Sequence, residues 1–353
     1  MDLAAYVDSG VVPAAVSLVA RGDDVEVRVA GPVKRDSIFR IASMTKPIVA
    51  AALMVLVEDG KVALADRVDK WLPELADLQV VRTPQSPVED VVPASRPITV
   101  FDLLTSRAGY GLPTDFSLPA AQSLFDFTFG PPPLDEWLTQ LTAIPMLAQP
   151  GETFLYNTCS DIQGVLIARI SGQSLPDFLA ERVFGPLGMT DTAFEVPAAK
   201  QDRFTTLYTH DLEVSERPGE AWTSLPAFAS GAGGLVSTAD DWLKFGRALL
   251  DHSLLSRESI TRMTTDHLTA EQRRDSEIFL EGQGWGFGGS VDVTARNPWN
   301  VPGRYGWTGG LGTAAHIIPS TGTVTILLTQ VTMTSATAPQ IMRDFWRANT
   351  ISG

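Results

Sequence analysis

The sequence contains little cysteine and little histidine. With one cysteine, Cys159, no intramolecular disulfide can form, and nothing in the sequence requires an oxidising compartment. The four histidines are isolated from one another, and none has the spacing of metal ligands. We therefore expect no metal and no other cofactor.

Basic charge is also scarce. The 27 Lys and Arg residues are outnumbered by 41 Asp and Glu, which gives a formal net charge of -14 and a pI near 4.7. Such a chain repels nucleic-acid phosphates and anionic membranes. The apolar run at residues 11–20 is short and contains Pro13, and residues 1–10 lack Lys and Arg. These features predict a soluble, cytoplasmic protein without nucleic-acid or membrane partners. They give no indication of its oligomeric state.

Two motifs of other enzyme classes are missing or weak. No Gly-x-Ser-x-Gly segment occurs, so the nucleophile elbow of an α/β-hydrolase is absent. The glycine-rich segment at residues 282–289 follows no clear strand, which makes it a poor phosphate cradle. We interpret it as a strand or loop near the active site.

The strand patterns lie at the two ends of the chain. Residues 11–20 and 25–30 form one predicted β-hairpin, and residues 314–318 and 324–329 form another. The simplest packing of these runs is one antiparallel sheet built from both ends of the chain and covered by helices.

Helical patterns lie mainly between these strands. Residues 43–57 are apolar on most faces, which is typical of a helix buried in a large core. The fold class is therefore α+β, with a discontinuous sheet domain (1–70 and 205–353), an inserted, mostly helical domain (71–204) and the active site at their interface. Further helices are predicted at 2–9, 161–170, 175–183, 239–250 and 336–348.

Ser43 and Lys46 are the first candidates for catalysis. A serine hydroxyl becomes a good nucleophile only when another group removes its proton. A lysine three residues later on a helix lies on the same face as the serine. A helix N-cap serine followed by a surface lysine would give the same pattern. However, Lys46 leads into an almost wholly apolar helix, which favours a functional role.

Four segments together resemble the class C β-lactamases and their relatives, the DD-peptidases, D-aminopeptidases and family VIII carboxylesterases. The segment at 38–47 (IFRIASMTKP) is similar to the nucleophile region of that superfamily. The segments at 99–109 (TVFDLLTSRAG), 186–192 (PLGMTDT) and 233–241 (GGLVSTADD) are similar to its other recurrent stretches. Their order and spacing agree over roughly residues 10–335. The resemblance implies a β-lactamase/transpeptidase-like fold and an acyl-enzyme on Ser43.

The second element of that superfamily is Tyr-x-Asn, or a Tyr-Ser variant in the esterases. Residues 151–158 (GETFLYNT) match it, which implies that Tyr156 shares the proton handling with Lys46. Thr158 stands where the lactamases have Asn, and we assign it to substrate binding. This departure argues against lactam or peptide substrates. A half-buried core tyrosine is the alternative interpretation of Tyr156.

The third element is Lys-Thr-Gly or His-x-Gly on an edge strand. Here its place is taken by Trp307, Thr308, Gly309 and Gly310, so a tryptophan replaces the cation. Trp307 cannot hold a substrate carboxylate but can pack against an apolar group. The resemblance implies that the amides of Ser43 and Gly310 form the oxyanion hole. A plain glycine turn with a core tryptophan is the alternative.

These motifs predict a serine carboxylesterase that acts on small to medium carboxylic esters. The principal base is either Lys46 or Tyr156. The alternatives are a β-lactamase or D-peptide hydrolase, an acyltransferase that uses the same site, and a non-catalytic penicillin-binding sensor. The sequence leaves acyl and alcohol specificity open.

Overall fold

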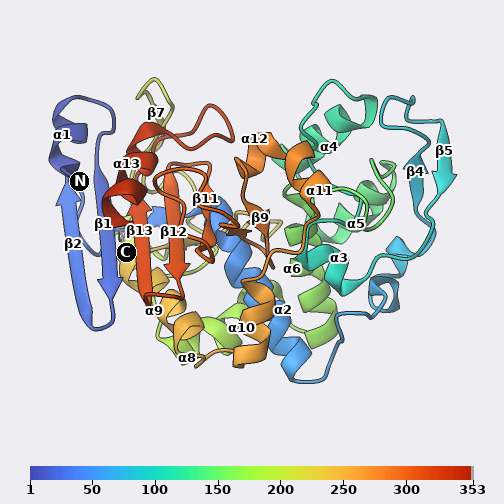
Figure 1. Cartoon of the computed structure of the whole chain (residues 1–353), viewed down its shortest axis with the longest axis horizontal. Coiled ribbons are helices and arrows are strands. Elements are labelled where there is room, and N and C mark those ends of the chain that lie inside the picture. Colours follow the sequence, from blue (N-terminus) through green and yellow to red (C-terminus); the bar gives the residue numbers. More distant parts are fainter. Residues whose placement is uncertain (351–353) are drawn as a thin grey trace.

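The computed structural model describes residues 1–350, and one seven-stranded antiparallel sheet is its centre. The strand order is β2-β1-β13-β12-β11-β10-β9, so the first two strands lie beside the last ones (Figure 1). The predicted α+β class and the sheet built from both ends of the chain are confirmed. The strands are β1 (Ala15–Arg21), β2 (Asp24–Ala30), β9 (Gly284–Trp285), β10 (Ser290–Val291), β11 (Tyr305–Gly309), β12 (Thr313–Ile318) and β13 (Thr323–Leu328).

The central strands β1, β12 and β13 are buried on both faces of the sheet, and their successive side chains alternate between the two faces. On β1, Val16 and Leu18 belong to the main hydrophobic core, whereas Ala15 and Val19 belong to a second cluster. The second cluster contains residues of α1 (Leu3–Asp8) and α13 (Gln340–Asn349), whereas α9 (Ala239–Leu250) contributes to the main core. The hydrophobic face of each of these helices is thereby removed from water.

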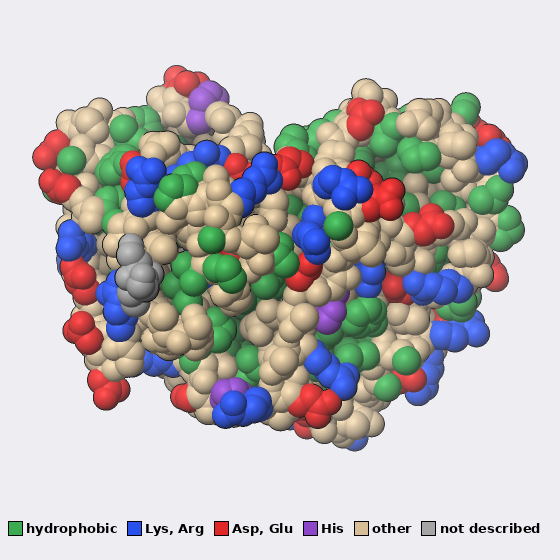
Figure 2. All heavy atoms as spheres, in the orientation of Figure 1, with side chains coloured by type: hydrophobic (Ala, Val, Ile, Leu, Met, Phe, Trp, Pro, Cys, Tyr) green, Lys and Arg blue, Asp and Glu red, His purple; other side chains and the backbone are tan. Residues whose placement is uncertain are grey.

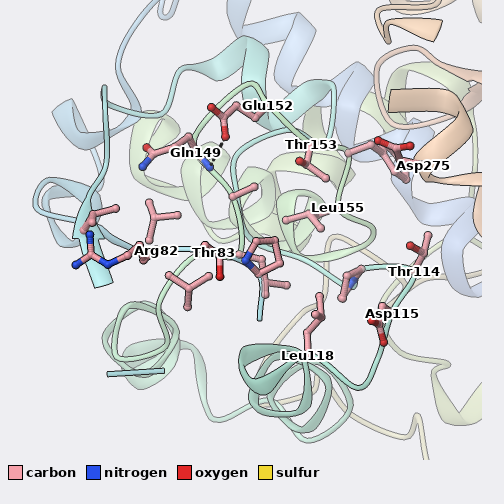
Figure 3. A pocket seen from close by; sticks show the side chains of 18 residues that line it. Arg82, Thr83, Thr114, Asp115, Leu118, Gln149, Glu152, Thr153, Leu155 and Asp275 are labelled. Carbon is pink, nitrogen blue, oxygen red and sulfur yellow. Dashed lines mark hydrogen bonds between the residues drawn. The ribbon is translucent and has the colours of Figure 1, made fainter. Parts of the chain in front are cut away.

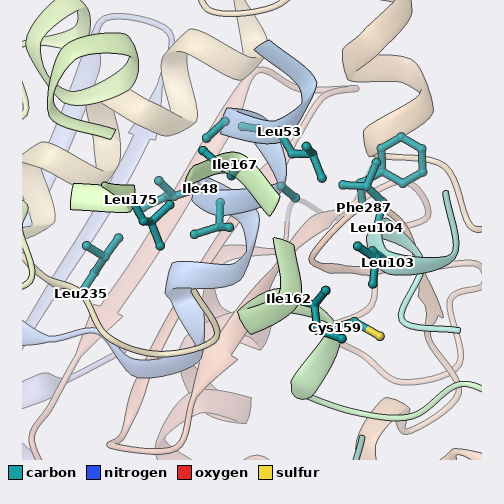
Figure 4. Packing of buried hydrophobic residues seen from close by; sticks show 14 of the residues in the cluster. Ile48, Leu53, Leu103, Leu104, Cys159, Ile162, Ile167, Leu175, Leu235 and Phe287 are labelled. Carbon is teal, nitrogen blue, oxygen red and sulfur yellow. The ribbon is translucent and has the colours of Figure 1, made fainter. Parts of the chain in front are cut away.

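The main core forms around α2 (Thr45–Glu58) and α6 (Thr158–Ser171). Residues 45–56 of α2 are all buried, which confirms the prediction of a buried apolar helix. Figure 4 shows Ile48 and Leu53 packed among Ile162 and Ile167. Burial of one such side chain contributes roughly 1.5–3 kcal/mol. This packing holds the start of α2, directly after Ser43, against the start of α6.

The remaining elements are short and join these layers. Small two-stranded sheets lie outside the main sheet, and most of the helices between residues 100 and 187 lie on one side of it (Figure 1). These elements are β3 (Phe39–Arg40), β4 (Gln79–Val81), β5 (Val91–Pro93), β6 (Leu207–Tyr208), β7 (Val214–Glu216), β8 (Val236–Ser237), α3 (Val100–Leu104), α4 (Pro119–Phe129), α5 (Leu134–Thr142), α7 (Leu175–Leu179), α8 (Gly185–Leu187), α10 (Arg257–Met263), α11 (Ala270–Asp275) and α12 (Glu277–Leu280).

Several predicted boundaries are wrong by a few residues, and the reasons are local. The helix expected from residue 43 begins at Thr45, because residues 42–44 form a 3-10 turn. The last helix begins at Gln340 instead of residue 336, because Pro339 takes the N-cap. The helix expected at 175–183 ends as α-helix at Leu179 and continues as a π-turn. The bounds predicted for α9 are correct, and Thr238 caps it.

No helix among the described residues is both long enough and apolar enough to cross a membrane.

Candidate active site

Ser43 lies in the tight turn that precedes α2, at the edge of a cleft. The residue before it, Ala42, has a φ of +45°, a left-handed conformation that side chains other than glycine rarely adopt. Such a conformation persists only where the surrounding structure enforces it, and it is frequent at active sites. Ser43 is half-buried, and its hydroxyl oxygen accepts two hydrogen bonds, one from each side.

Lys46 lies one turn further along and is 1% exposed. Its Nζ donates to Ser43 Oγ at 2.9 Å, to Asn157 Oδ1 at 2.7 Å and to the carbonyl oxygen of Ala232 at 2.7 Å. An ammonium group has three N–H donors, and here each of them has an acceptor. The surroundings of Lys46 are therefore suited to its charged form.

Tyr156 approaches Ser43 from the other side. Its hydroxyl donates to Ser43 Oγ at 2.9 Å and accepts from Trp307 Nε1 at 2.7 Å. Lys46 Nζ also lies 4.5 Å from the centre of the tyrosine ring. The backbone of Tyr156 pairs in both directions with Leu112, which fixes its position. Ser43, Lys46 and Tyr156, which the sequence predicted as one site, are thus in direct contact.

Trp307 lies behind Tyr156 and does not face the cleft. It is 6% exposed and packs in an aromatic cluster that also holds Trp285, Phe279 and Phe154. The expectation that Trp307 packs against substrate is therefore not supported, because its indole edge is directed to Tyr156 Oη. Trp285 comes from the glycine-rich segment at 282–289, which forms the short strand β9 and a turn near the site, in agreement with the predicted strand or loop.

Two further side chains, which the motifs did not indicate, hold Lys46 in place. Asn157, with a φ of +85°, accepts from Lys46 directly. Asp161 accepts from the Ala232 amide at 3.0 Å and from Ser230 Oγ at 2.7 Å, and so fixes the carbonyl that Lys46 contacts. Burial raises the pKa of the Asp161 carboxyl, and these hydrogen bonds oppose that rise. The position of Asn157 directly after Tyr156 could have indicated its role. Nothing in the sequence around Asp161, one helical turn further, indicated a role at the site.

Two other predicted binding residues lie away from the cleft. Thr158 is the first residue of α6 and is 2% exposed, because the start of the helix turns its side chain into the core. Thr308 alternates with Trp307 on β11 and borders a small hollow beside His316 and Trp346. Neither residue lines the cleft next to Ser43.

Cys159 is fully buried, and burial raises the pKa of its thiol to about 12. We assign it no role at the site.

Gly309 and Gly310 bring the end of β11 to Ser43. A Cβ on Gly309 would overlap the Ile41 carbonyl oxygen and Thr313 Oγ1, so only glycine allows this close approach. Gly310 faces open space and lines the same cleft as Ser43, and its carbonyl oxygen accepts from the Met333 amide at 2.8 Å. The position of Gly310 is thus suited to an oxyanion hole shared with Ser43.

We expect Gly309→Ala to lower the free energy of unfolding by about 1–3 kcal/mol, because the added methyl group forces β11 away from Ile41. The same shift moves Gly310 and should lower kcat. Thermal unfolding and ester hydrolysis measure the two effects. Gly310→Ala is the control, since no atom lies within 4 Å of its added Cβ and its stability should stay within about 0.5 kcal/mol. Equal stability of the two variants would contradict the close-approach argument.

The cleft has a volume of about 880 Å³ and is mainly apolar. Among the described residues that line it there is no Asp, Glu, Lys or Arg. Its polar groups come from residues such as Ser43, Asn157 and Ser230, and its apolar wall includes Phe129, Trp222, Phe194, Leu225, Phe228, Leu311 and Met333. A cleft of this composition suits an uncharged, apolar ligand.

A second, smaller cavity of about 290 Å³ lies among β4, the start of α4 and residues 147–155 (Figure 3). It is lined by charged residues at its rim, including Arg82, Asp115, Glu152 and Asp275. Ser43, Lys46 and Tyr156 do not line it. The chemistry therefore belongs to the larger cleft.

The fold and the site together define a serine hydrolase of the penicillin-recognising type. In this class the serine of a Ser-x-x-Lys motif lies in hydrogen-bond contact with a tyrosine, as Ser43 does with Tyr156. The model of the Beta-lactamase family matches residues 2–341, and the chain belongs to that family.

Known relatives agree with this assignment. Protein Rv1367c of Mycobacterium tuberculosis is 37% identical over 349 residues, which cover 92% of this chain and 87% of that protein. Esterase EstB of Burkholderia gladioli is 29% identical over 372 residues, which cover 92% and 88%. The solved structure of EstCE1, a hydrolase with promiscuous acyltransferase activity, has a TM-score of 0.79 at 24% identity and covers 97% of this chain and 96% of its own. That likeness shows the fold.

Proposed function

We propose that this protein is a serine carboxylesterase that forms an acyl-enzyme on Ser43. The observation that carries the proposal is the hydrogen-bonded set of Ser43, Lys46 and Tyr156 at the edge of an apolar cleft without charged lining residues. The esterase activity named for the relative EstB supports the same substrate class. We also propose that residues 71–204 form an inserted domain. Ser43 and Gly310 then belong to the sheet domain, and Tyr156 belongs to the insertion.

Tyr156 is the base in the proposed acylation step. All three N–H groups of Lys46 are already engaged with acceptors, so it acts as a fixed positive charge. That charge and the Trp307 N–H both stabilise a phenolate on Tyr156. The phenolate takes the proton of Ser43 while Oγ forms a bond to the ester carbonyl carbon. The oxyanion is bound by the amides of Ser43 and Gly310.

Collapse of the tetrahedral intermediate breaks the bond to the alcohol oxygen. Tyr156 returns its proton to that oxygen, and the alcohol leaves. A water molecule then repeats the sequence on the acyl-enzyme: it loses a proton to Tyr156, attacks the carbonyl carbon, and Ser43 regains the proton as the acid departs. An alcohol in place of water would give acyl transfer by the same steps, which keeps the acyltransferase as a second activity of this site.

The rival functions fit the cleft less well. A β-lactamase or D-peptide hydrolase must hold a substrate carboxylate, and no cationic side chain among the described residues lines the cleft. A penicillin-binding sensor does not require the complete set of proton-handling contacts found around Ser43. We further propose a cytoplasmic location, which a single, buried, reduced cysteine supports.

Substrate comparison tests the proposed function. We expect p-nitrophenyl butyrate to be hydrolysed with a kcat/KM at least about 100-fold above that for nitrocefin, a chromogenic lactam with a carboxylate. A fluorophosphonate should label Ser43 stoichiometrically, as peptide mass spectrometry would detect. Faster hydrolysis of nitrocefin, or labelling of another serine, would overturn the assignment.

Replacement of the Trp307 indole tests the phenolate argument. Trp307→Phe keeps an aromatic ring but removes the N–H that donates to Tyr156 Oη. We expect kcat to fall about 10- to 100-fold, because a hydrogen bond to a charged group contributes roughly 1.5–3 kcal/mol. KM should change little, because Trp307 does not line the cleft.

Trp285→Phe is the matched control for this variant. Trp285 belongs to the same aromatic cluster, but its Nε1 has no hydrogen-bond partner among the described residues. Its kcat should stay within about 2-fold of the wild type. A similar loss of kcat in both variants would assign the effect to packing instead of to the hydrogen bond.

A further inference from the structure

The cleft beside Ser43 continues outward onto an exposed apolar surface. Phe129, at the end of α4, lines the cleft and is nevertheless 67% exposed. Leu225, in the facing loop, also lines it and is 53% exposed. Large apolar side chains that remain open to water at the mouth of a cleft mark a surface that becomes covered when a ligand binds.

The exposed surface follows α4 away from the cleft. The ring centres of Phe129 and Phe125 are 4.6 Å apart, and those of Phe125 and Phe116 are 6.0 Å apart. Phe125 and Phe116 are 40% and 41% exposed. Figure 2 shows hydrophobic side chains gathered on the surface in the region of α4. The three rings thus form an aromatic row that is continuous with the apolar wall of the cleft.

The geometry at Ser43 decides which part of an ester lies on this wall. The tetrahedral carbon carries four groups: Ser43 Oγ, the oxyanion, the leaving oxygen and the acyl chain. The oxyanion lies at Gly310, and the leaving oxygen must lie near Tyr156 Oη, which returns its proton. Tyr156 and Trp307 do not line the cleft. The fourth group, the acyl chain, is therefore the one directed along the cleft.

We propose that the cleft and the aromatic row form an acyl subsite, and that the enzyme prefers esters of uncharged, long or bulky apolar acids. Phe129 and Leu225 are its specificity-determining residues. The substrate's own acyl chain is the occupant, because the surface is continuous with the nucleophile and the cleft lacks charged lining residues. This inference rests on the proposed esterase function and narrows its substrate class.

Two ester series test the subsite. In p-nitrophenyl esters from acetate to octanoate, below their aggregation limits, we expect kcat/KM to rise at least about 30-fold, since each buried methylene contributes roughly 2- to 4-fold. In acetates of ethanol to octanol, which lengthen the alcohol, kcat/KM should change less than about 3-fold. Selectivity for the alcohol, or a maximum at the acetyl ester, would overturn the proposal.

Surface variants assign the selectivity to residues. Phe129→Ser and, separately, Leu225→Ser should lower kcat/KM for the octanoate about 10-fold and that for the acetate less than about 2-fold, because only the long chain reaches them. Val29→Ser, on β2, removes a side chain of similar exposure (41%) far along the sheet and should change neither. An equal loss on all ester lengths would contradict the subsite.

The outcomes separate the two proposals. If Ser43-dependent hydrolysis of the acetate persists without any preference for longer acyl chains, the esterase function stands and the acyl subsite is overturned. If no ester is hydrolysed, both are overturned. Activity that rises only above the aggregation limit of the octanoate would assign the aromatic row to a lipid surface and also overturn the subsite.

Discussion

Ser43→Ala should lower kcat/KM for p-nitrophenyl butyrate by about 10⁴-fold or more. The variant removes the atom that becomes bonded to the acyl group, so only the oxyanion amides and the cleft can still assist direct attack by water. Two hydrogen bonds end on Ser43 Oγ, from Lys46 and from Tyr156.

The fold should tolerate this change. Ser43 is half-buried in a short turn, and alanine fits a helical start without strain. Lys46 keeps two of its three acceptors, Asn157 and Ala232. Thermal unfolding should therefore shift by a few degrees at most, and the loss of activity can be read as a loss of chemistry.

Ser224→Ala is the matched control for the nucleophile. Ser224 also lines the cleft, but it is exposed and does not take part in the chain of hydrogen bonds around Lys46. Its kcat/KM should stay within about 2-fold of the wild type. Substantial ester hydrolysis by Ser43→Ala, measured after removal of contaminating esterases by a second purification, would show that another group is the nucleophile.

Ser43, Lys46 and Tyr156 could be predicted from the sequence because the chemistry of this site depends on a few residue types in a recognisable order. Ser43 and Lys46 are one helical turn apart, so their contact follows from local geometry alone. Tyr156 lies 113 positions further than Ser43, and only the resemblance of several segments together brought it to the same site. The sheet was predictable because β-rich apolar runs at both ends of the chain, each pair separated by a turn, pack most simply as one antiparallel sheet.

Side-chain direction was the part that the sequence did not predict. Trp307 was expected to face substrate, but its position on β11, opposite Ala315, directs the indole to Tyr156. Thr158 was expected to bind substrate, but Asn157, with a φ of +85°, is the residue that contacts Lys46, and Thr158 begins α6 with its side chain in the core. Such a backbone conformation is imposed by tertiary packing, and no local sequence pattern predicts it.

Tyr156→Phe is the variant with the second-largest expected effect, a decrease in kcat of about 10³-fold. General acid–base catalysis contributes about 10²- to 10⁴-fold, and Tyr156 serves in both acylation and deacylation. The ring still packs on Phe279, at a centroid distance of 4.9 Å, so substrate binding and KM should change little. Pre-steady-state hydrolysis of p-nitrophenyl butyrate would measure both steps.

This variant also distinguishes the two candidate bases. If Lys46 accepted the proton of Ser43, Tyr156→Phe would leave that route intact and kcat would fall by less than about 10-fold. If Tyr156 is the base, kcat should show the full decrease of about 10³-fold, because both chemical steps lose their proton acceptor. The size of the decrease therefore tests the argument that the three engaged N–H groups of Lys46 hold it as a fixed cation.

Loss of the tyrosine hydroxyl should also have a small structural effect. The Trp307 N–H is left without its acceptor in a buried cluster, which costs roughly 1–3 kcal/mol. Tyr110→Phe is the matched control: Tyr110 is fully buried, and its hydroxyl has no partner among the described residues, so its removal should leave stability equal or higher. Tyr110→Phe should also keep full activity. A similar loss of kcat in both variants would show that the removal of a buried hydroxyl lowers kcat in general. The loss in Tyr156→Phe could then not be assigned to proton transfer at Ser43.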